Sequence, residues 1–206
     1  MIRKIVLLFL AVCLGCNYLR AQDVVPGNSI EFLEQHPYFN KAVPAINATT
    51  LNGKVFSLDN HLDMIVVLHF WSLTCAACFK ELPELNRLVK EYNGKVVFIS
   101  CMEESKTTLS KRFSSNGAFY ILNKPVYGNQ KIDFEIIPDA NNVRVSYASA
   151  NIPKEAVPIS YFIQAGVLKN ISFGYVIGQG NSPTNETANY RHLKRMLDQL
   201  LTKSEK

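Results

Sequence analysis

Apolar residues fall into blocks whose spacing predicts alternating strands and helices. Two nearly continuous apolar runs, rich in β-branched and aromatic residues, are typical of strands buried on both faces: residues 64–71 (MIVVLHFW) and 95–100 (KVVFIS). Between them, leucines at helical spacing predict a helix over 75–92, ended by an Asn-Gly pair. A second helix is predicted over 105–116. Because strand, helix, strand and helix alternate, we expect the two strands to pair in parallel.

Two hairpins flank this central pattern. Residues 45–58 alternate apolar and polar positions around an Asn-Gly turn, so we expect two antiparallel strands that cap one edge of a sheet. Further on, strands over 159–163 and 167–176 surround a second short turn. A closing helix over 184–202 carries an apolar stripe. Together these elements predict an α/β domain with a central mixed sheet flanked by helices.

The pattern weakens in two segments. Residues 22–41 are polar and contain prolines, so we expect a loosely packed extension with a short helix over 29–35. Residues 117–155 show no sustained periodicity, and we interpret them as an insertion in the domain. Within it, strands are predicted at 118–122 and 143–147, with a polar turn between them.

The first 21 residues are predicted to be a secretory signal. A basic pair precedes an apolar run over 5–16, and the cleavage point follows Ala21. The run is shorter than the roughly 20 residues that span a bilayer, so we do not expect a retained membrane anchor. Cys16 supports a lipoprotein alternative, because it follows Leu and Gly as in a bacterial lipobox. The main domain is then expected over 42–206.

Composition and charge exclude several classes of protein. The chain has 206 residues, of which 48% are hydrophobic and 11% aromatic, enough for one compact domain and unlike a disordered protein. The formal charge is +5, and removing the three basic residues of the signal leaves 19 basic and 17 acidic residues. These are interleaved along the chain, so no nucleic-acid partner is expected.

Three of the five cysteines lie outside the predicted signal. Cys75 and Cys78 flank two alanines where a buried strand meets the first turn of a helix. The helix dipole and unpaired N–H groups favour a thiolate at Cys75, and Cys78, one turn on, can attack a mixed disulfide formed there. This position and spacing indicate a dithiol redox pair. Cys101, at a strand end, is expected to be a buried free thiol.

Other interpretations of the two cysteines remain open. A permanently closed structural disulfide is one, although a four-residue loop gains little stability from closure. Structural zinc is weakly supported, because no second cysteine pair is present. His69 precedes the motif and would complete a metal site with Cys75 and Cys78, or else be a core histidine. We expect no bound metal.

Residues 71–83 (WSLTCAACFKELP) resemble the W-x-x-x-C-x-x-C-x-x-E-x-P signature of exported thioredoxin-like proteins of the TlpA/ResA type. The resemblance extends to the first hairpin, to the second apolar run, and to residues 157–163 (VPISYFI), which are similar to the family's proline before a sheet hairpin. It covers roughly 42–116 and 156–202. It implies a thioredoxin-like fold and thiol-disulfide oxidoreductase activity without a cofactor.

The resemblance implies roles for the residues around the motif. Cys75 would be the exposed attacking thiol and Cys78 the resolving thiol. Glu81 would accept a proton during exchange or raise thiol pKa values by repulsion, whereas its helix position alone is equally typical of a solvated surface residue. Pro83 would kink the helix.

Further roles concern contact with a substrate. Pro158 would form a cis peptide bond and leave the backbone of Val157 to pair with a substrate chain. Trp71 would shield the dithiol and contribute to substrate binding, and a buried aromatic at a strand end is the alternative. The Ala-Ala pair between the cysteines departs from the polar or proline residues often found there, so the reduction potential is not predicted.

The function implied is reduction of disulfides in exported proteins, outside the cytoplasm in a periplasmic or membrane-facing location. Electrons would come from a membrane partner. Proteins of the TlpA/ResA type often serve cytochrome c assembly. One alternative is a copper- or haem-delivery protein that uses Cys75, Cys78 and His69. A peroxiredoxin-like peroxidase fits less well, because Leu68 stands where that pattern has proline. An interaction platform without redox chemistry is a third.

Overall fold

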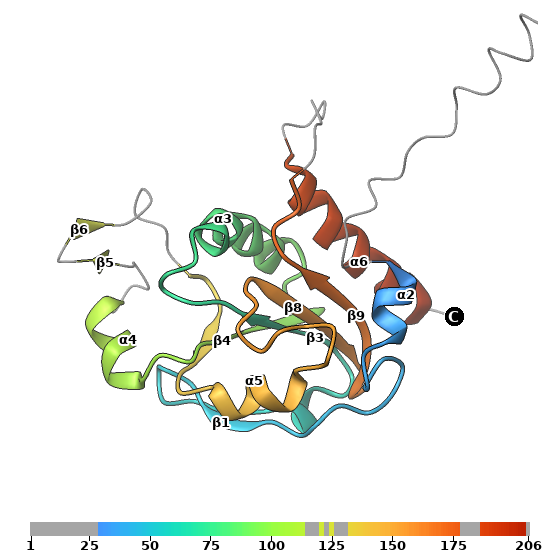
Figure 1. The fold of residues 1–206 in the computed structure, drawn as a ribbon, viewed down its shortest axis with the longest axis horizontal. Coiled ribbons are helices and arrows are strands. Elements are labelled where there is room, and N and C mark those ends of the chain that lie inside the picture. The colour runs from blue at the N-terminus through green and yellow to red at the C-terminus, as the bar shows by residue number, and fades with distance from the viewer. Residues whose placement is uncertain (1–28, 114–119, 122–123, 126–131, 178–185, 205–206) are drawn as a thin grey trace, which may run out of the picture.

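A five-stranded mixed sheet forms the centre of the structure (Figure 1). The computed structural model describes residues 29–113, 120–121, 124–125, 132–177 and 186–204. The strands in spatial order are β7 (Glu135–Ile137), β4 (Val96–Cys101), β3 (Ile65–Phe70), β8 (Ile159–Gln164) and β9 (Val167–Phe173). β3, β4 and β7 are parallel, whereas β8 runs antiparallel to both β3 and β9. The expected mixed sheet and the parallel pairing of the two apolar runs are confirmed.

Helices cover both faces of this sheet. α3 (Ala76–Glu91) and α6 (Ala188–Ser204) lie on one face and α5 (Asn141–Tyr147) on the other (Figure 1). Side chains of β3 alternate between these layers: Ile65 and Val67 pack with the leucines of α3, whereas Val66 and Leu68 pack toward α5. This alternation decides which residues of β3 lie beneath α3.

The first predicted hairpin is confirmed. β1 (Asn47–Thr49) and β2 (Val55–Ser57) pair antiparallel around the Asn-Gly turn, and η2 (Leu58–His61) follows. The hairpin is a separate two-stranded sheet, but the N–H of Leu51 donates to the carbonyl of Ile136 at 2.7 Å. The hairpin therefore lies beside β7, an outer strand of the main sheet, as expected for a hairpin that caps a sheet edge.

The segment before the hairpin is more ordered than predicted. The short helix is present as α2 (Ile30–Glu34). At its N-terminus the Ser29 hydroxyl accepts a hydrogen bond from the backbone N–H of Phe32. The chain then forms bridges to β9 through Phe39 and Ala42, and His36 is buried against α5. The expectation of loose packing was wrong for the described part of 22–41, because these contacts join it to the sheet.

The prediction of a strand at 143–147 was wrong. These residues form α5, in which Val143 and Tyr147 face the core one helical turn apart and Val145 is exposed. A five-residue V-R-V-S-Y run satisfies both alternation and i, i+4 spacing, so its pattern did not separate strand from helix. β7, which also lies within 117–155, was not predicted, although it is part of the main sheet.

Other element boundaries differ modestly from the predictions. α4 (Lys106–Arg112) ends earlier than predicted, before the buried Phe113. Near 118–122, β5 (Tyr120–Ile121) pairs with β6 (Lys124–Pro125), and the neighbouring residues lie outside the described ranges. The hairpin of β8 and β9 and the closing helix α6 are confirmed.

The predicted signal and Cys16 lie outside the described residues. Across the part of the chain that the structure describes, the helices are too short or too polar to cross a membrane. The division of the chain at residues 21 and 41 stays a prediction.

Candidate active site

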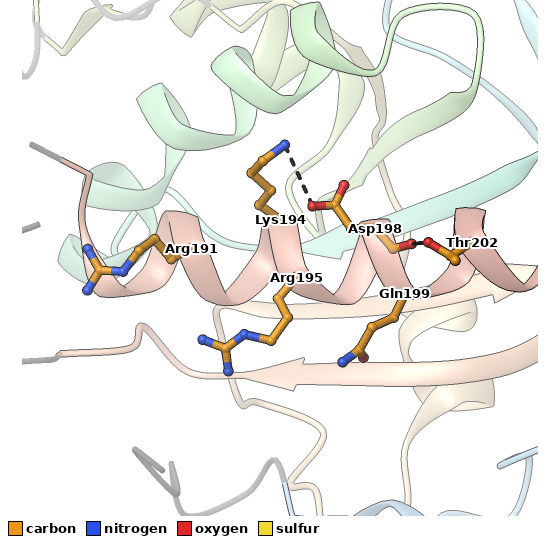
Figure 2. Close-up of a pocket in the computed structure, with 6 residues that line it drawn as sticks. All are labelled: Arg191, Lys194, Arg195, Asp198, Gln199 and Thr202. Carbon is orange, nitrogen blue, oxygen red and sulfur yellow. Dashed lines mark hydrogen bonds and ion pairs between the residues drawn. The ribbon is translucent and has the colours of Figure 1, made fainter. Parts of the chain in front are cut away.

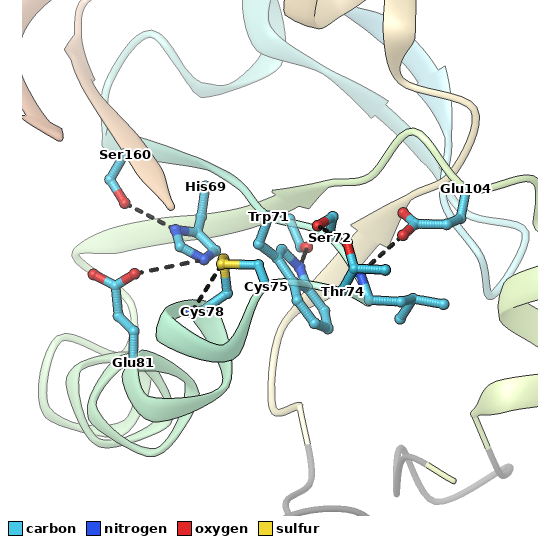
Figure 3. Close-up of a disulfide and its surroundings, with 11 residues drawn as sticks. His69, Trp71, Ser72, Thr74, Cys75, Cys78, Glu81, Glu104 and Ser160 are labelled. Carbon is cyan, nitrogen blue, oxygen red and sulfur yellow. Dashed lines mark hydrogen bonds and ion pairs between the residues drawn. A yellow bond between two sulfur atoms is a disulfide. The ribbon is translucent and has the colours of Figure 1, made fainter. Parts of the chain in front are cut away.

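Cys75 and Cys78 form a disulfide at the N-terminus of α3 (Figure 3). Cys75 is the N-cap, with extended backbone, and its sulfur accepts a hydrogen bond from the N–H of Cys78 at 3.1 Å. At this position a thiolate would be stabilised by that N–H and by the helix dipole. The geometry supports Cys75 as the thiol that becomes the nucleophile after reduction.

The two sulfurs differ in accessibility. Cys78 is 0% exposed, packed among Phe79, Leu82 and Met102, whereas Cys75 is half-buried. An incoming thiol or disulfide therefore reaches Cys75 first. Cys75 is thus the more exposed of the two cysteines, as the resemblance implied for the attacking thiol.

Trp71 lies in the core beside the disulfide. Its indole N–H donates to the hydroxyl of Ser100, and its ring meets that of Phe79 edge to face at 5.6 Å. Only 1% of the residue is exposed. The shielding role fits this position, but the expected contact of Trp71 with substrate is not supported, because the ring is covered in this conformation.

The loop before the dithiol is held by Glu104, a residue that sequence reasoning missed. The N–H of Leu73 donates to the Glu104 carboxylate at 2.8 Å, and the hydroxyls of Ser72 and Thr74 lie 3.2 Å apart (Figure 3). Glu104 follows β4, which lies beside β3 in the sheet. Only the parallel pairing of these strands brings it to the loop, so no local signal marked it.

Glu81 is buried beneath the second turn of α3. It is 1% exposed, so the alternative of a solvated surface residue is wrong. The pKa of Glu81 is raised to about 8, chiefly by burial; a hydrogen bond from Asn189 at 3.1 Å opposes the shift, and the neighbouring Glu84 charge adds to it. A carboxyl group with this pKa is mostly protonated at neutral pH. Its ionised fraction is the form that can accept a proton, and its pKa is close to the value of about 8.5 for an ordinary thiol.

A buried polar network continues from Glu81 toward α6. The amide of Asn189 also donates to Glu84 at 2.6 Å, and Glu84 accepts from the hydroxyls of Tyr175 and Thr187 at 2.8 and 2.7 Å. Sequence reasoning missed these residues. Their one signal was the presence of Glu and Asn on otherwise apolar helix faces, which does not identify a partner.

His69 lies on the side of β3 that faces α3. Its Nδ1 is 3.0 Å from the Ser160 hydroxyl, and its Nε2 is 3.9 Å from Oε2 of Glu81 (Figure 3). Burial lowers the pKa of His69 to about 3, so the imidazole is neutral. In the described ranges no three Cys, His, Asp or Glu side chains are grouped to hold a metal ion. The alternative of a metal site at Cys75 and Cys78 concerns the reduced thiols and stays a hypothesis.

The peptide bond between Val157 and Pro158 is cis, as the resemblance implied. Pro158 is buried, and Val157 packs against the cluster that contains Trp71 and Cys78. The fold therefore places this loop next to the dithiol, although the two segments are far apart in sequence. Pairing of a substrate chain with Val157 stays a prediction.

Cys101 is a buried free thiol, as predicted. Burial raises the pKa of its thiol to about 12. A thiol with this pKa stays protonated at neutral pH, a state that disfavours thiol-disulfide exchange.

A separate hollow runs along α6 (Figure 2). Within it Lys194 pairs with Asp198 at 3.7 Å. Its lining residues are Arg191, Lys194, Arg195, Asp198, Gln199 and Thr202. None of these belongs to the dithiol site, so the two features are distinct.

Comparison with known proteins agrees with this geometry. A family model described as the AhpC/TSA family matches residues 39–170. The thioredoxin-like protein YneN of Bacillus subtilis (strain 168) is 28% identical over 88 residues, which are 43% of this chain and 52% of YneN. The thiol-disulfide oxidoreductase ResA of Bacillus thuringiensis subsp. konkukian (strain 97-27) is 31% identical over 77 residues, 37% of this chain and 44% of ResA. The chain spans about half the length of these relatives.

Structural similarity covers more of the chain. A DsbF homologue from Corynebacterium diphtheriae superposes with a TM-score of 0.55 at 18% identity, over 77% of this chain and 86% of that chain. The likeness confirms the thioredoxin-like fold.

Proposed function

The chain belongs to the AhpC/TSA family, and from this premise we propose that it is a thiol-disulfide oxidoreductase. One observation carries the proposal: the dithiol pair joins a half-buried cysteine at a helix N-terminus to a fully buried one, with a buried acid one turn further on. ResA, which is similar over the matched segment, is named for the same activity. The structural likeness supports the fold on which this chemistry depends.

The geometry supports a two-step exchange. The Cys75 thiolate attacks one sulfur of a partner disulfide, and the partner's other sulfur leaves as a thiolate. Cys78 then loses its proton and attacks the Cys75 sulfur, which forms the intramolecular disulfide and releases the second partner thiolate. The partner gains two electrons, which the dithiol loses. Glu81 accepts the Cys78 proton, because it lies on the same helix face three residues on.

The partner chain is proposed to bind beside the cis peptide bond. Val157 packs on the same cluster as the buried cysteine, so a chain paired with its backbone would pass close to Cys75. An extended segment added in this way gains main-chain hydrogen bonds whatever its side chains are. This mode of binding suits an enzyme that acts on several protein disulfides.

The setting and direction of the reaction also belong to the proposal. We infer that the protein acts outside the cytoplasm after loss of residues 1–21, or as a lipoprotein attached through Cys16. It would reduce disulfides of exported proteins and receive electrons from a membrane partner. The motif's resemblance to TlpA/ResA-type proteins supports this direction and a role in cytochrome c maturation.

The reduction potential of the Cys75–Cys78 pair tests the proposal. The protein is equilibrated in glutathione or dithiothreitol buffers, and the redox state is followed by fluorescence of Trp71, the single tryptophan, which packs in the same cluster as Cys78. A value below about −220 mV supports a reductase, and one near −120 mV indicates a disulfide donor. A pair that does not cycle refutes oxidoreductase activity. Cys75→Ser provides the baseline.

A further inference from the structure

Three polar side chains form a row across the sheet beside α3. The strand register places His69 of β3 between Ser100 of β4 and Ser160 of β8, and all three are buried. Earlier positions on the same face are apolar, for example Val67 and Phe98. Buried polar side chains in an apolar layer require hydrogen-bond partners. The partners of these three side chains therefore indicate their role.

Two members of the row have evident partners. Ser100 accepts from the indole of Trp71, and Ser160 lies at hydrogen-bond distance from Nδ1 of His69. The other ring nitrogen of His69, Nε2, has no hydrogen bond in the described structure, and neither has Oε2 of Glu81. These two buried atoms are 3.9 Å apart (Figure 3), slightly too far for a hydrogen bond, and a small rotation of the carboxyl group would join them.

We propose that His69 is a positioning residue for Glu81, to which it hydrogen bonds in both the protonated and the ionised state of the carboxyl group. This inference rests on the proposed function, because it assigns His69 a part in proton transfer during dithiol exchange. The Ser160 hydroxyl, on the far side of the His69 ring, makes hydrogen bonding in both states feasible. This hydroxyl can either donate a hydrogen bond to Nδ1 or accept one from it.

The two states differ in the tautomer of the ring. When Glu81 is protonated, its O–H donates to Nε2 of His69, and Nδ1–H donates to Ser160. When Glu81 is ionised, Nε2–H donates to the carboxylate, and the Ser160 hydroxyl donates to Nδ1. The ring stays neutral in both states, in agreement with its lowered pKa. The difference in charge between the two states therefore lies on the Glu81 carboxyl group and not on the ring.

Other groups around the carboxyl do not replace this partner. Asn189 hydrogen bonds to Oε1, the opposite oxygen, and Glu84 acts on Glu81 through its charge. Tyr175 and Thr187 donate to Glu84. In the described structure Oε2 is therefore left to His69, on the side of the carboxyl that faces the sheet.

The proton balance follows from these contacts. As Cys78 attacks the Cys75 sulfur of a mixed disulfide, its proton passes to Glu81, a new S–S bond forms, and the partner sulfur leaves with the electron pair of the broken bond. Loss of the hydrogen bond at Oε2 would destabilise the ionised carboxylate more than the protonated carboxyl group, because hydrogen bonds to a charged group are stronger than those to a neutral one. Loss of the His69 contact should therefore raise the pKa of Glu81.

A two-phase assay separates the steps. The full chain is reduced, with Cys13→Ser and Cys16→Ser in every sample, and is mixed with an aromatic disulfide whose thiolate is coloured. The first release reports attack by Cys75, and the second reports attack by Cys78 on the mixed disulfide. Both rates are measured between pH 5 and 10.

Two substitutions form the matched test. His69→Gln keeps a nitrogen near Nε2, on the Glu81 side, whereas His69→Asn keeps one near Nδ1, on the Ser160 side. We expect His69→Asn to move the inflection of the second phase upward by about one pH unit and to slow that phase at pH 7 by about three- to tenfold. The Gln variant should stay near wild type. The first phase should be unchanged in both.

If the second phase has the same pH inflection in His69→Gln and His69→Asn, whether or not it differs from wild type, the inference is overturned and dithiol exchange is not affected. If wild type shows no second release, the proposed function itself fails, a result distinct from that one. His36→Asn, a substitution of another buried histidine that contacts Tyr147 of α5 on the opposite face, controls for general loss of packing. If the His69 variants do not fold, Ser160→Ala serves instead, with a smaller upward shift expected and an unchanged inflection counting against the inference.

Discussion

The backbone N–H of Leu73 donates a 2.8 Å hydrogen bond to the carboxylate of Glu104. This contact links the loop that leads into the dithiol to the chain that leaves the neighbouring parallel strand. The loop conformation, and with it the approach to Cys75, therefore depends on a residue outside the CxxC motif.

Replacing Glu104 with Gln should loosen this loop. A neutral amide is a weaker acceptor than a carboxylate, so the free energy of unfolding should fall by about 1 kcal/mol. Alkylation of reduced Cys75 should also change, because the loop holds the cysteine at the helix start. Urea denaturation and timed alkylation measure the two effects. Glu155→Gln, at an exposed ion pair, should leave both unchanged.

Substitution of Cys75 and substitution of Cys78 should have different effects on exchange with a protein disulfide. Cys75→Ser should reduce exchange with a protein disulfide to the uncatalysed rate, because Cys78 is buried. Cys78→Ser should still attack but remain trapped as a mixed disulfide with the partner, since no resolving thiol follows. Non-reducing gel electrophoresis with a model disulfide protein distinguishes these outcomes. Trapping by Cys75→Ser instead would reverse the assigned roles.

Glu81 should make stability depend on pH. Its pKa is raised from 4.5 to about 8 in the folded oxidised protein, so the folded state binds the proton more tightly than the unfolded state. Its contribution therefore favours folding below about pH 4.5 and is lost progressively as the pH rises toward 8.

Glu81→Gln should remove this slope. Relative to wild type, the variant should gain on the order of a few kcal/mol in unfolding free energy between pH 5 and pH 8. Urea denaturation across this range provides the measurement, with the exposed Glu34→Gln as the control. Parallel stability curves for Glu81→Gln and wild type would contradict the assignment.

Asn189→Ala should be strongly destabilising. It removes the donor shared by Glu81 and Glu84 and the acceptor for the N–H of Val176. Buried groups left without partners cost about 1–3 kcal/mol each, so we expect a loss of at least about 2 kcal/mol at pH 7. Thermal and urea denaturation test this loss. Asn142→Ala, on the exposed side of α5, should be nearly neutral.

The sequence predicted the elements whose patterns extend over many residues. The apolar run at 64–71 and the amphipathic stretch at 75–92 became β3 and α3 within one or two residues. The short segments at 135–137 and 143–147 are too brief to show a period, so tertiary contacts decide their conformation. In both cases the deciding neighbours lie far away in the chain.

The same limit applies to the site. Cys75, Cys78 and Glu81 lie within one helix, and their spacing was enough to group them. His69 was noticed, but its contacts with Ser160 and Glu81 depend on strand register and helix packing. Asn189 is 105 residues from Glu84, and no local pattern predicts that two such residues meet.

Both outer strands of the main sheet carry a neighbouring segment. The chain around Phe39 and Ala42 lies along β9, and the loop of the first hairpin bonds to β7. Open sheet edges are the places where folded proteins join strand to strand and aggregate. These two segments thus occupy part of the backbone edge of each outer strand, which leaves less of it free to pair with the strand of another chain.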